Sequence, residues 1–336
     1  SAPNMYGKDV QQAIEATKNI GKSPLVFFDL ETTGTDISNK AFSITEIAMA
    51  KFLKPADTID RDKAQVFNIA VAPNQEKAAY LKTLIRKAQD LVPLAKNERY
   101  AIASLMRYAG DTIDPVTKAV KGHSSLFDPD ISNTARNFTR REVAAMRLGL
   151  AKLTREGVKE EQVFDLMQDF MKDLAGGKAT IVGHNIYDFD MPAIQKLTDG
   201  KQRWSNLIKS LNNPSSLDTL NLYRSLKSDP RKLYRNLIFE DIRSREYANV
   251  KLTKNVRKEI MEKTKDRMRN LDLSQGAYSL DAFRDVFGIS GKGAHMGEAD
   301  VLSHAEVFGR SLSSVRNMIR VASGTESTGA IKDLSF

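Results

Sequence analysis

The sequence predicts an α/β protein, in which a central sheet is flanked by helices. Short apolar runs, such as residues 24–31 and 179–183, are typical of buried strands. Longer segments between these runs carry apolar residues at helical spacing. With 336 residues, of which 41% are hydrophobic and 28% are charged, the chain has the size and composition of a globular protein that buries a substantial core.

Five strands are expected, each a short segment rich in apolar and β-branched residues. Four of them cover residues 24–31, 43–53, 64–72 and 179–183. The fifth begins near residue 216 and turns into a helix that runs to about 228. Their spread along the chain, with helices between them, is what a layered α/β domain requires.

Helices are expected in most of the remaining chain. Those with an apolar face cover residues 8–20, 76–92, 97–109, 139–153, 160–176, 192–198, 279–287 and 298–314. Two further helices, at 224–237 and 256–270, are basic and show little apolar face. The chain is therefore divided into an N-terminal helical extension (1–22), a main domain (23–316) and a flexible Ser/Gly/Thr-rich tail (317–336).

The composition excludes several classes of site and location. Cysteine is absent, which excludes disulfides and thiolate metal sites and fits a cytosolic setting. No apolar run approaches the ~18–20 residues of a membrane span. No N-terminal apolar segment resembles a secretory signal. We therefore expect a cytoplasmic or nucleoid-associated protein that is neither secreted nor embedded in a membrane.

Positive charge is concentrated in one segment. The formal net charge is +9, but residues 201–270 alone hold 18 lysines and arginines against 8 aspartates and glutamates. Such a run is either a solvated helical face or a surface that follows phosphates, and both interpretations stay open. In the second case Trp204 could stack on the bases of a single strand. The expected phosphate contacts are Arg231, Lys232 and Arg235.

Two carboxylates lie at the end of the first predicted strand, in VFFDLETTGT at 26–35. Asp29 and Glu31 are two residues apart, so on a strand they point to the same face. Two anions this close repel each other unless a cation lies between them. In a chain without cysteine and with 4 histidines, the ligands are oxygens, which suit Mg²⁺ or Mn²⁺. The alternative is a strand end with two solvated acids.

Two later segments contain further candidates. In VGHNIYDFDMP (182–192), Asp190 precedes Met-Pro, so it either caps a helix or reaches the carboxyl edge of the sheet. In GKGAHMGEADVLSH (291–304), His295 lies in or just after a Gly-rich loop and Asp300 falls in the first turn or so of the final helix. A lone loop histidine is usually solvated, so His295 gains meaning only together with the acids.

Taken in order, these residues resemble the motifs of the DEDDh 3′–5′ exonucleases, a family that includes proofreading exonuclease subunits and oligoribonuclease. FFDLETTG is similar to the first motif, and AHMGEAD matches the third, H-x-x-x-x-D. HNIYDFD is similar to the second, with N-x-x-x-F-D spacing in place of the commoner N-x-x-F-D. The resemblance covers roughly 24–74, 155–225 and 277–314. It leaves out the helices at about 75–150 and the basic segment at 226–276, which we expect to be insertions.

The resemblance implies an RNase H-like core with a central mixed sheet and large helical insertions. It implies that Asp29, Glu31, Asp190 and Asp300 hold two Mg²⁺ or Mn²⁺ ions, and that His295, rather than His304, is the general base. The implied reaction is hydrolysis of phosphodiester bonds at the 3′ ends of nucleic acids, which releases nucleoside 5′-monophosphates. Single-stranded 3′ ends are the expected substrate, with DNA slightly favoured over RNA.

The resemblance also implies contacts to the terminal nucleotide, although several of these residues have a structural interpretation in a turn. The expected contacts are Leu30, Thr32, Thr33, Gly34 and Asn185. A replication or repair protein could bind as a partner, and the alternative function is a nuclease-like accessory or proofreading subunit acting mainly through a polymerase or another protein. The first strand also resembles that of haloacid dehalogenase phosphohydrolases. Their second acid is an aspartate, however, and neither their lysine nor their late Asp-Asp motif is evident here.

Overall fold

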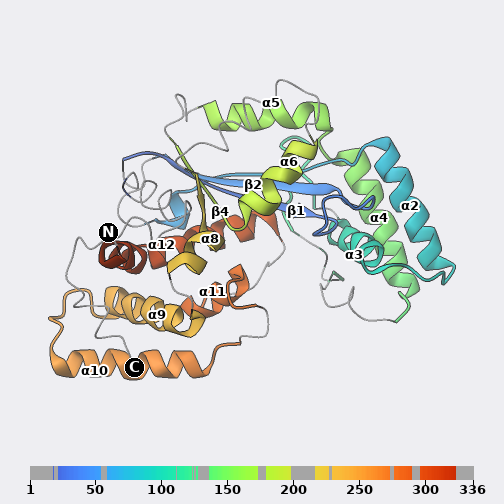
Figure 1. Ribbon diagram of the computed structural model, residues 1–336. Coiled ribbons are helices and arrows are strands. Elements are labelled where there is room, and N and C mark those ends of the chain that lie inside the picture. Colours follow the sequence, from blue (N-terminus) through green and yellow to red (C-terminus); the bar gives the residue numbers. More distant parts are fainter. Residues whose placement is uncertain are drawn as a thin grey trace.

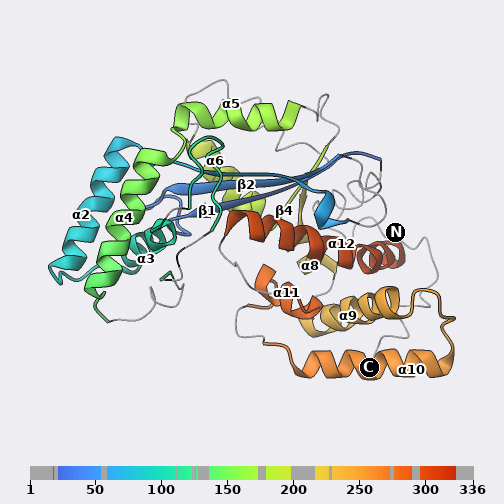
Figure 2. The same ribbon diagram turned by 180° about the vertical axis from the view of Figure 1, so that it is seen from behind.

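The chain forms a five-stranded mixed sheet with helices on both faces (Figures 1 and 2). The predicted α/β fold class is therefore confirmed. The computed structural model describes residues 18, 22–53, 59–110, 112–122, 124, 126–127, 136–172, 179–197, 216–226, 229–272, 276–289 and 296–322. The helix expected at 8–20 lies almost entirely outside these residues, as does the end of the chain beyond 322.

The strand order places four strand ends at one edge of the sheet. In spatial order the strands are β3 (Gln65–Ala70), β2 (Ile44–Phe52), β1 (Leu25–Thr32), β4 (Thr180–Gly183) and β5 (Leu217–Asp218). β2 is antiparallel to both of its neighbours, whereas β4 is parallel to β1 and β5 is parallel to β4. The carboxyl ends of β1, β3, β4 and β5 therefore meet at the same edge, where ligand sites of open α/β sheets form. All five predicted strands are confirmed.

The two faces of β1 are buried against different sets of helices, because successive side chains of a strand point to opposite faces. Val26, Phe28 and Leu30 pack with residues of α5 (Glu160–Met171) and α6 (Met191–Leu197). Leu25 and Phe27 belong to a cluster on the other face, to which four helices contribute most of the residues. These helices are α8 (Thr219–Leu226), α9 (Pro230–Glu246), α11 (Leu280–Phe287) and α12 (Gly297–Ala322). Burial on both faces explains the continuous apolar run of this strand.

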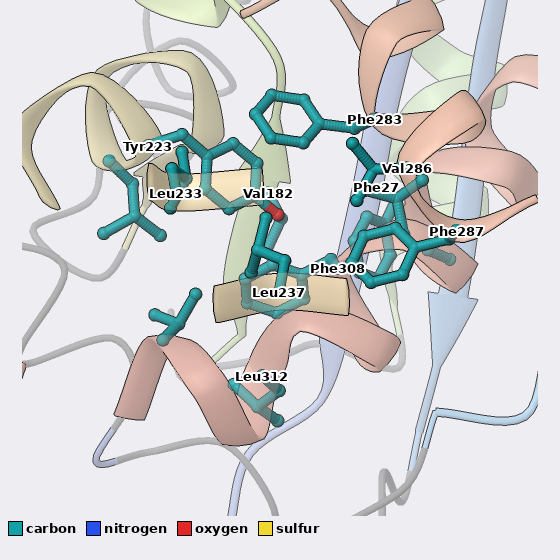
Figure 3. Close-up of a cluster of buried hydrophobic side chains, with 14 of the residues drawn as sticks. Phe27, Val182, Tyr223, Leu233, Leu237, Phe283, Val286, Phe287, Phe308 and Leu312 are labelled. Carbon is teal, nitrogen blue, oxygen red and sulfur yellow. The ribbon is translucent and has the colours of Figure 1, made fainter. Parts of the chain in front are cut away.

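The first helix of the basic segment, α9, packs into the large apolar cluster that contains Leu25 and Phe27, which we call the main core. The expectation that this helix has little apolar face is therefore wrong. Leu233 and Leu237 of α9 lie in the same cluster as Phe27 and Phe308 (Figure 3). Apolar residues of α9 recur at the three- and four-residue spacing of one helix face, which the basic residues between them obscured in the sequence. Asp229 caps this helix and Pro230 opens it, so the helix predicted at 224–237 does not run unbroken.

Helix α10 (Lys254–Arg269) forms an outer layer on α9 (Figure 1). It buries only Ile260 and Thr264 among its 16 residues, so the expectation of a small apolar face is right for this helix. Several of its cations form ion pairs, including Arg267 with Asp241 and Lys263 with Glu246. The final helix, α12, extends to Ala322, so the boundary predicted at 317 for a flexible tail is wrong.

The segment between β3 and α5 forms a helical layer at one end of the sheet (Figure 1). We call this layer the middle helices, and it has an apolar core of its own that also contains Ala70 of β3. The middle helices are α2 (Gln75–Gln89), α3 (Lys96–Leu105), the 3₁₀ turn Met106–Tyr108 and α4 (Arg140–Glu156). Asn74 caps α2, and Thr139 caps α4 in a capping box with Glu142.

One glycine sets how closely α3 and α4 approach each other. A Cβ added at Gly149 of α4 would overlap the backbone carbonyl of Leu105, the last residue of α3.

None of the helices in the described part of the chain is long and apolar enough to cross a membrane.

Gly149→Ala should lower the free energy of unfolding by about 1–3 kcal/mol, because the new methyl group meets backbone that cannot move without separating α3 from α4. The measurement is urea unfolding followed by circular dichroism. Gly122→Ala is the matched control, because a Cβ at Gly122 meets nothing within 4 Å, and its effect should stay within about 0.5 kcal/mol. Equal stabilities of the two variants would contradict this account of the packing.

Candidate metal centre

Three carboxylates from two elements meet above the carboxyl end of β1. Oxygens of Asp29, Glu31 and Asp300 all lie within 4.8 Å of one another. Asp29 and Glu31 continue the face of β1 that carries Leu25 and Phe27, and that face packs against α12. Asp300 is the fourth residue of α12, as expected for the first helical turn. The shared face predicted for the two strand acids is confirmed.

Asp190 lies near the same group, at the end of the turn that follows the neighbouring strand β4. β4 is parallel to β1, and a π-helical turn (Ile186–Asp190) follows β4 and ends at this residue. The negative charge of Asp190 is among the causes that raise the pKa of Asp29, after burial and the charge of Asp300. Asp190 leads directly into α6, so the interpretation as a helix N-cap is wrong. A π-helical turn takes up one more residue than an α-helical turn, which accommodates the longer N-x-x-x-F-D spacing.

Asp218, at the end of β5, was not among the residues selected from the sequence. Its carboxylate accepts hydrogen bonds from the backbone N–H groups of Asn185 (2.9 Å), Tyr187 (3.2 Å) and Leu220 (3.0 Å). Asp218 thereby holds the start of the π-helical turn, where Asn185 has a left-handed φ of 63°. An acid at the end of a strand parallel to β4 was the signal that could have identified it.

His184 and His304, the two histidines in the described part of the chain, are buried or largely buried near this edge and hydrogen-bonded to neighbouring elements. Thr219 Oγ1 lies 2.9 Å from His184 Nδ1 and 2.9 Å from His304 Nε2. His184 Nε2 also lies 2.7 Å from the carbonyl oxygen of Tyr278. Burial lowers the pKa of His184 to about 4, and burial is the largest cause that lowers the pKa of His304 well below its ordinary value. Both rings are therefore neutral and structural. His295 lies outside the described residues.

Two buried arginines contact the acids, and neither was selected from the sequence. Arg284 of α11 donates to Asp300 Oδ1 at 2.5 Å and to Asp281 at 2.5 Å. Arg107, from the 3₁₀ turn of the middle helices, has its Nη1 3.6 Å from Glu31 Oε2. The side chains of Arg107 and Arg284 are 2% and 7% exposed, so the pairs Arg107–Glu31 and Arg284–Asp300 are largely shielded from water.

Burial disfavours the ionised form of a carboxyl group, and the pKa values of all four acids are raised accordingly. Burial is the largest cause that raises the pKa of Asp29, Asp190 and Asp300 well above the ordinary value. It raises the pKa of Glu31 to about 8, against the opposing effect of Arg107. The charge of a neighbouring acid adds to each of these shifts.

The residues present fit a hard divalent cation. Oδ2 of Asp29 and Oδ2 of Asp190 are buried without a hydrogen-bond partner in the described part of the chain. Buried polar atoms of folded proteins normally have partners, and a bound cation would provide one for these oxygens. The donor set consists of carboxylate oxygens alone, which suits Mg²⁺ or Mn²⁺.

The predicted substrate contacts near β1 divide into two kinds. Leu30 packs into the core, and Thr33 is buried with its hydroxyl donating to the carbonyl of Ala41 at 2.6 Å. Both side chains therefore have structural contacts at the end of β1 and in the loop after it. A contact of Leu30 or Thr33 with the terminal nucleotide stays a prediction. Thr32 is mostly buried and donates to the carbonyl of Gly34 at 2.6 Å.

The other predicted substrate contacts lie later in the chain, and the structure does not test their contact with a substrate. Asn185 belongs to the turn held by Asp218. Arg231 and Lys232 are exposed at the start of α9, and Arg235 is half-buried. Trp204 lies outside the described residues. The role of each as a substrate contact stays a prediction.

Comparisons of the chain with protein-family models, with curated proteins and with solved structures found no match. The arrangement of the acidic residues is therefore the basis for a functional proposal.

In the metal-free protein, raising the pH should lower the melting temperature. The pKa of Glu31 is raised from 4.5 to about 8 in the folded state, so folding is favoured while this group holds its proton. Its contribution is complete below about pH 4.5 and is lost as the pH rises through about 8. Thermal unfolding in EDTA between pH 5 and 9 should therefore show a steeper fall for the wild type than for Glu31→Gln. Identical pH dependence of the two proteins would contradict this assignment.

Proposed function

We propose that this protein is a metal-dependent 3′–5′ exonuclease that hydrolyses phosphodiester bonds at the 3′ ends of nucleic acids. One observation carries the proposal: four acids from three distant segments are buried together, and two of their oxygens have no partner among the described residues. These acids are the ones that the three sequence motifs select, in the order of the DEDDh exonucleases. The mixed sheet supports the further proposal that the core is RNase H-like.

Asp29, Glu31, Asp190 and Asp300 would hold two Mg²⁺ or Mn²⁺ ions, which when bound supply positive charge to the scissile phosphate and lower the pKa of the attacking water. The protein fixes the positions of these carboxylates. Arg284 orients Asp300 through a direct hydrogen bond, and Asp218 holds the turn that ends at Asp190.

A general base is still needed to take the proton of the attacking water. His295 is the proposed base, because its position in the third motif places it five residues before Asp300 and just before α12. Imidazole suits this role because its unperturbed pKa lies near neutral pH. The other histidine of that region, His304, is buried and bound to Thr219, so it is not accessible to a substrate.

The proposed substrate is a single-stranded 3′ end, with DNA slightly favoured over RNA. The exposed Arg231 and Lys232 could contact its backbone phosphates. Much of the remaining positive charge of α9 and α10 is paired with acids, as in the pairs Arg243–Glu240, Lys265–Glu262 and Arg269–Asp266. The number of lysines and arginines in the segment therefore overstates its capacity to bind phosphate.

Asp29→Asn and Asp190→Asn should each reduce nuclease activity to background, because each removes a carboxylate charge from the proposed metal centre. Activity is measured by Mg²⁺-dependent shortening of 5′-labelled single-stranded DNA and RNA. Melting temperatures in EDTA should hold or rise, since repulsion among the buried acids decreases. Asp188→Asn is the control, because Asp188 lies in the same turn but is exposed, and it should retain wild-type activity. Wild-type rates for the variants at positions 29 and 190 would refute the assignment.

His295→Ala should lower the cleavage rate by ~10²–10⁴, the usual contribution of general-base catalysis, and leave Mn²⁺ binding intact. His304→Ala should act differently, because it removes a buried ring that contacts Thr219 and Phe27. It should lower the melting temperature and, below that temperature, have little effect on the rate. A rate loss confined to the variant at position 304 would overturn the choice of base.

A further inference from the structure

The middle helices place two consecutive residues against the sheet beside the acids. Arg107 lies 3.6 Å from Glu31 through its Nη1 and donates to the carbonyl of Thr32 at 3.4 Å. The hydroxyl of Tyr108 lies 2.7 Å from Oε1 of Glu46. Glu31 and Glu46 are direct partners in the pairing of β1 with β2. One 3₁₀ turn therefore contacts both members of a cross-strand pair of acids.

Glu46 connects this turn to the helix that carries Asp300. The backbone N–H of Gly297, the first residue of α12, donates to Glu46 Oε2 at 3.2 Å. A Cβ added at Gly297 would come within 2.9 Å of the same oxygen and 3.0 Å of the Cβ of Ala48. The start of α12 is thus seated directly on β2, and Asp300 follows within the first turn.

The backbone of Glu31 is held from the same side. The Tyr108 hydroxyl also lies 2.7 Å from Thr45 Oγ1, and the Thr45 hydroxyl donates to the carbonyl of Glu31 at 3.2 Å. Arg107, Tyr108 and Glu46 are each no more than 1% exposed. Groups buried this completely, with hydrogen bonds to fixed partners, have little freedom to take up another arrangement.

We propose that Arg107 and Tyr108 are positioning residues of the metal centre. Arg107 holds the carboxylate of Glu31, and Tyr108 holds Glu46, which in turn fixes the start of α12 and hence Asp300. The middle helices are then part of the active centre rather than an accessory layer. This inference rests on the proposed metal centre, but it does not depend on what the protein cleaves.

Two conservative variants separate positioning from simple packing. Arg107→Lys keeps the positive charge but loses the planar guanidinium that reaches both Glu31 and Thr32. Tyr108→Phe removes one hydroxyl and leaves the ring in place. Tyr223→Phe is the matched control, because Tyr223 is also fully buried and its hydroxyl is hydrogen-bonded to Ser311. Arg136→Lys is the second control, because Arg136, which precedes α4, pairs with Glu142 of α4 and does not contact the acids of the site.

Mn²⁺ binding to the full chain is measured by isothermal titration calorimetry, and thermal unfolding is measured in EDTA. We expect Arg107→Lys and Tyr108→Phe to weaken Mn²⁺ binding about 10-fold or more, which is typical for loss of a group that orients a metal ligand. The two controls should lower the melting temperature without changing the dissociation constant by more than about twofold. A merely structural role would change the melting temperature alone.

Wild-type Mn²⁺ affinity in both Arg107→Lys and Tyr108→Phe would overturn this inference and leave the proposed nuclease function standing. If Arg107→Lys does not fold, Tyr108→Phe decides, because loss of one hydroxyl leaves the packing volume unchanged. Failure of the wild-type protein to bind Mn²⁺ would overturn both proposals. If Mn²⁺ binds and the two variants weaken it, but no nucleic acid is cut, the inference holds and the nuclease function fails.

Discussion

Mutual repulsion among four buried carboxylates constrains the structure around one edge of the sheet. Asp29, Glu31, Asp190 and Asp300 are buried or largely buried, so water screens their charges little and each raises the pKa of at least one other. Asp190 does so for Asp29 and is itself affected by Asp218. A fold keeps such a cluster only where other contacts outweigh its cost, because unpaired buried charges are strongly destabilising. The surrounding elements show how that cost is met.

Three of the four acids are held by different parts of the chain. Arg284 of α11 binds Asp300, and Arg107 of the middle helices pairs with Glu31. The turn that ends at Asp190 is held by backbone hydrogen bonds to Asp218 of β5. The main core on the α12 face and the separate core of the middle helices both support these contacts. Helices that have no counterpart in the sequence resemblance therefore take part in the architecture of the site.

The sequence predicted what depends on local pattern and did not predict what depends on distant contacts. All five strands follow from short runs of apolar and β-branched residues. The shared face of Asp29 and Glu31 follows from the two-residue period of β-structure. Arg107 and Arg284 were not identified, because an arginine within a helix carries no mark of a partner 76 or 16 residues away in the sequence. The core role of α9 was obscured because its apolar face is interrupted by basic residues. Asp218 was missed because its partners are backbone N–H groups.

The place of Asp300 on the last described helix has a consequence for the order of assembly during synthesis. β1, β2 and β3 are consecutive in the chain and can pair early as a meander. At that stage Asp29 and Glu31 are still open to water on the face that α12 will cover, so their repulsion is screened. The electrostatic penalty therefore falls on the docking of α12, which is synthesised after all five strands of the sheet. If the proposed metal centre binds a divalent cation, that ion favours the docking of α12 and so contributes to maturation of the protein as well as to the proposed reaction.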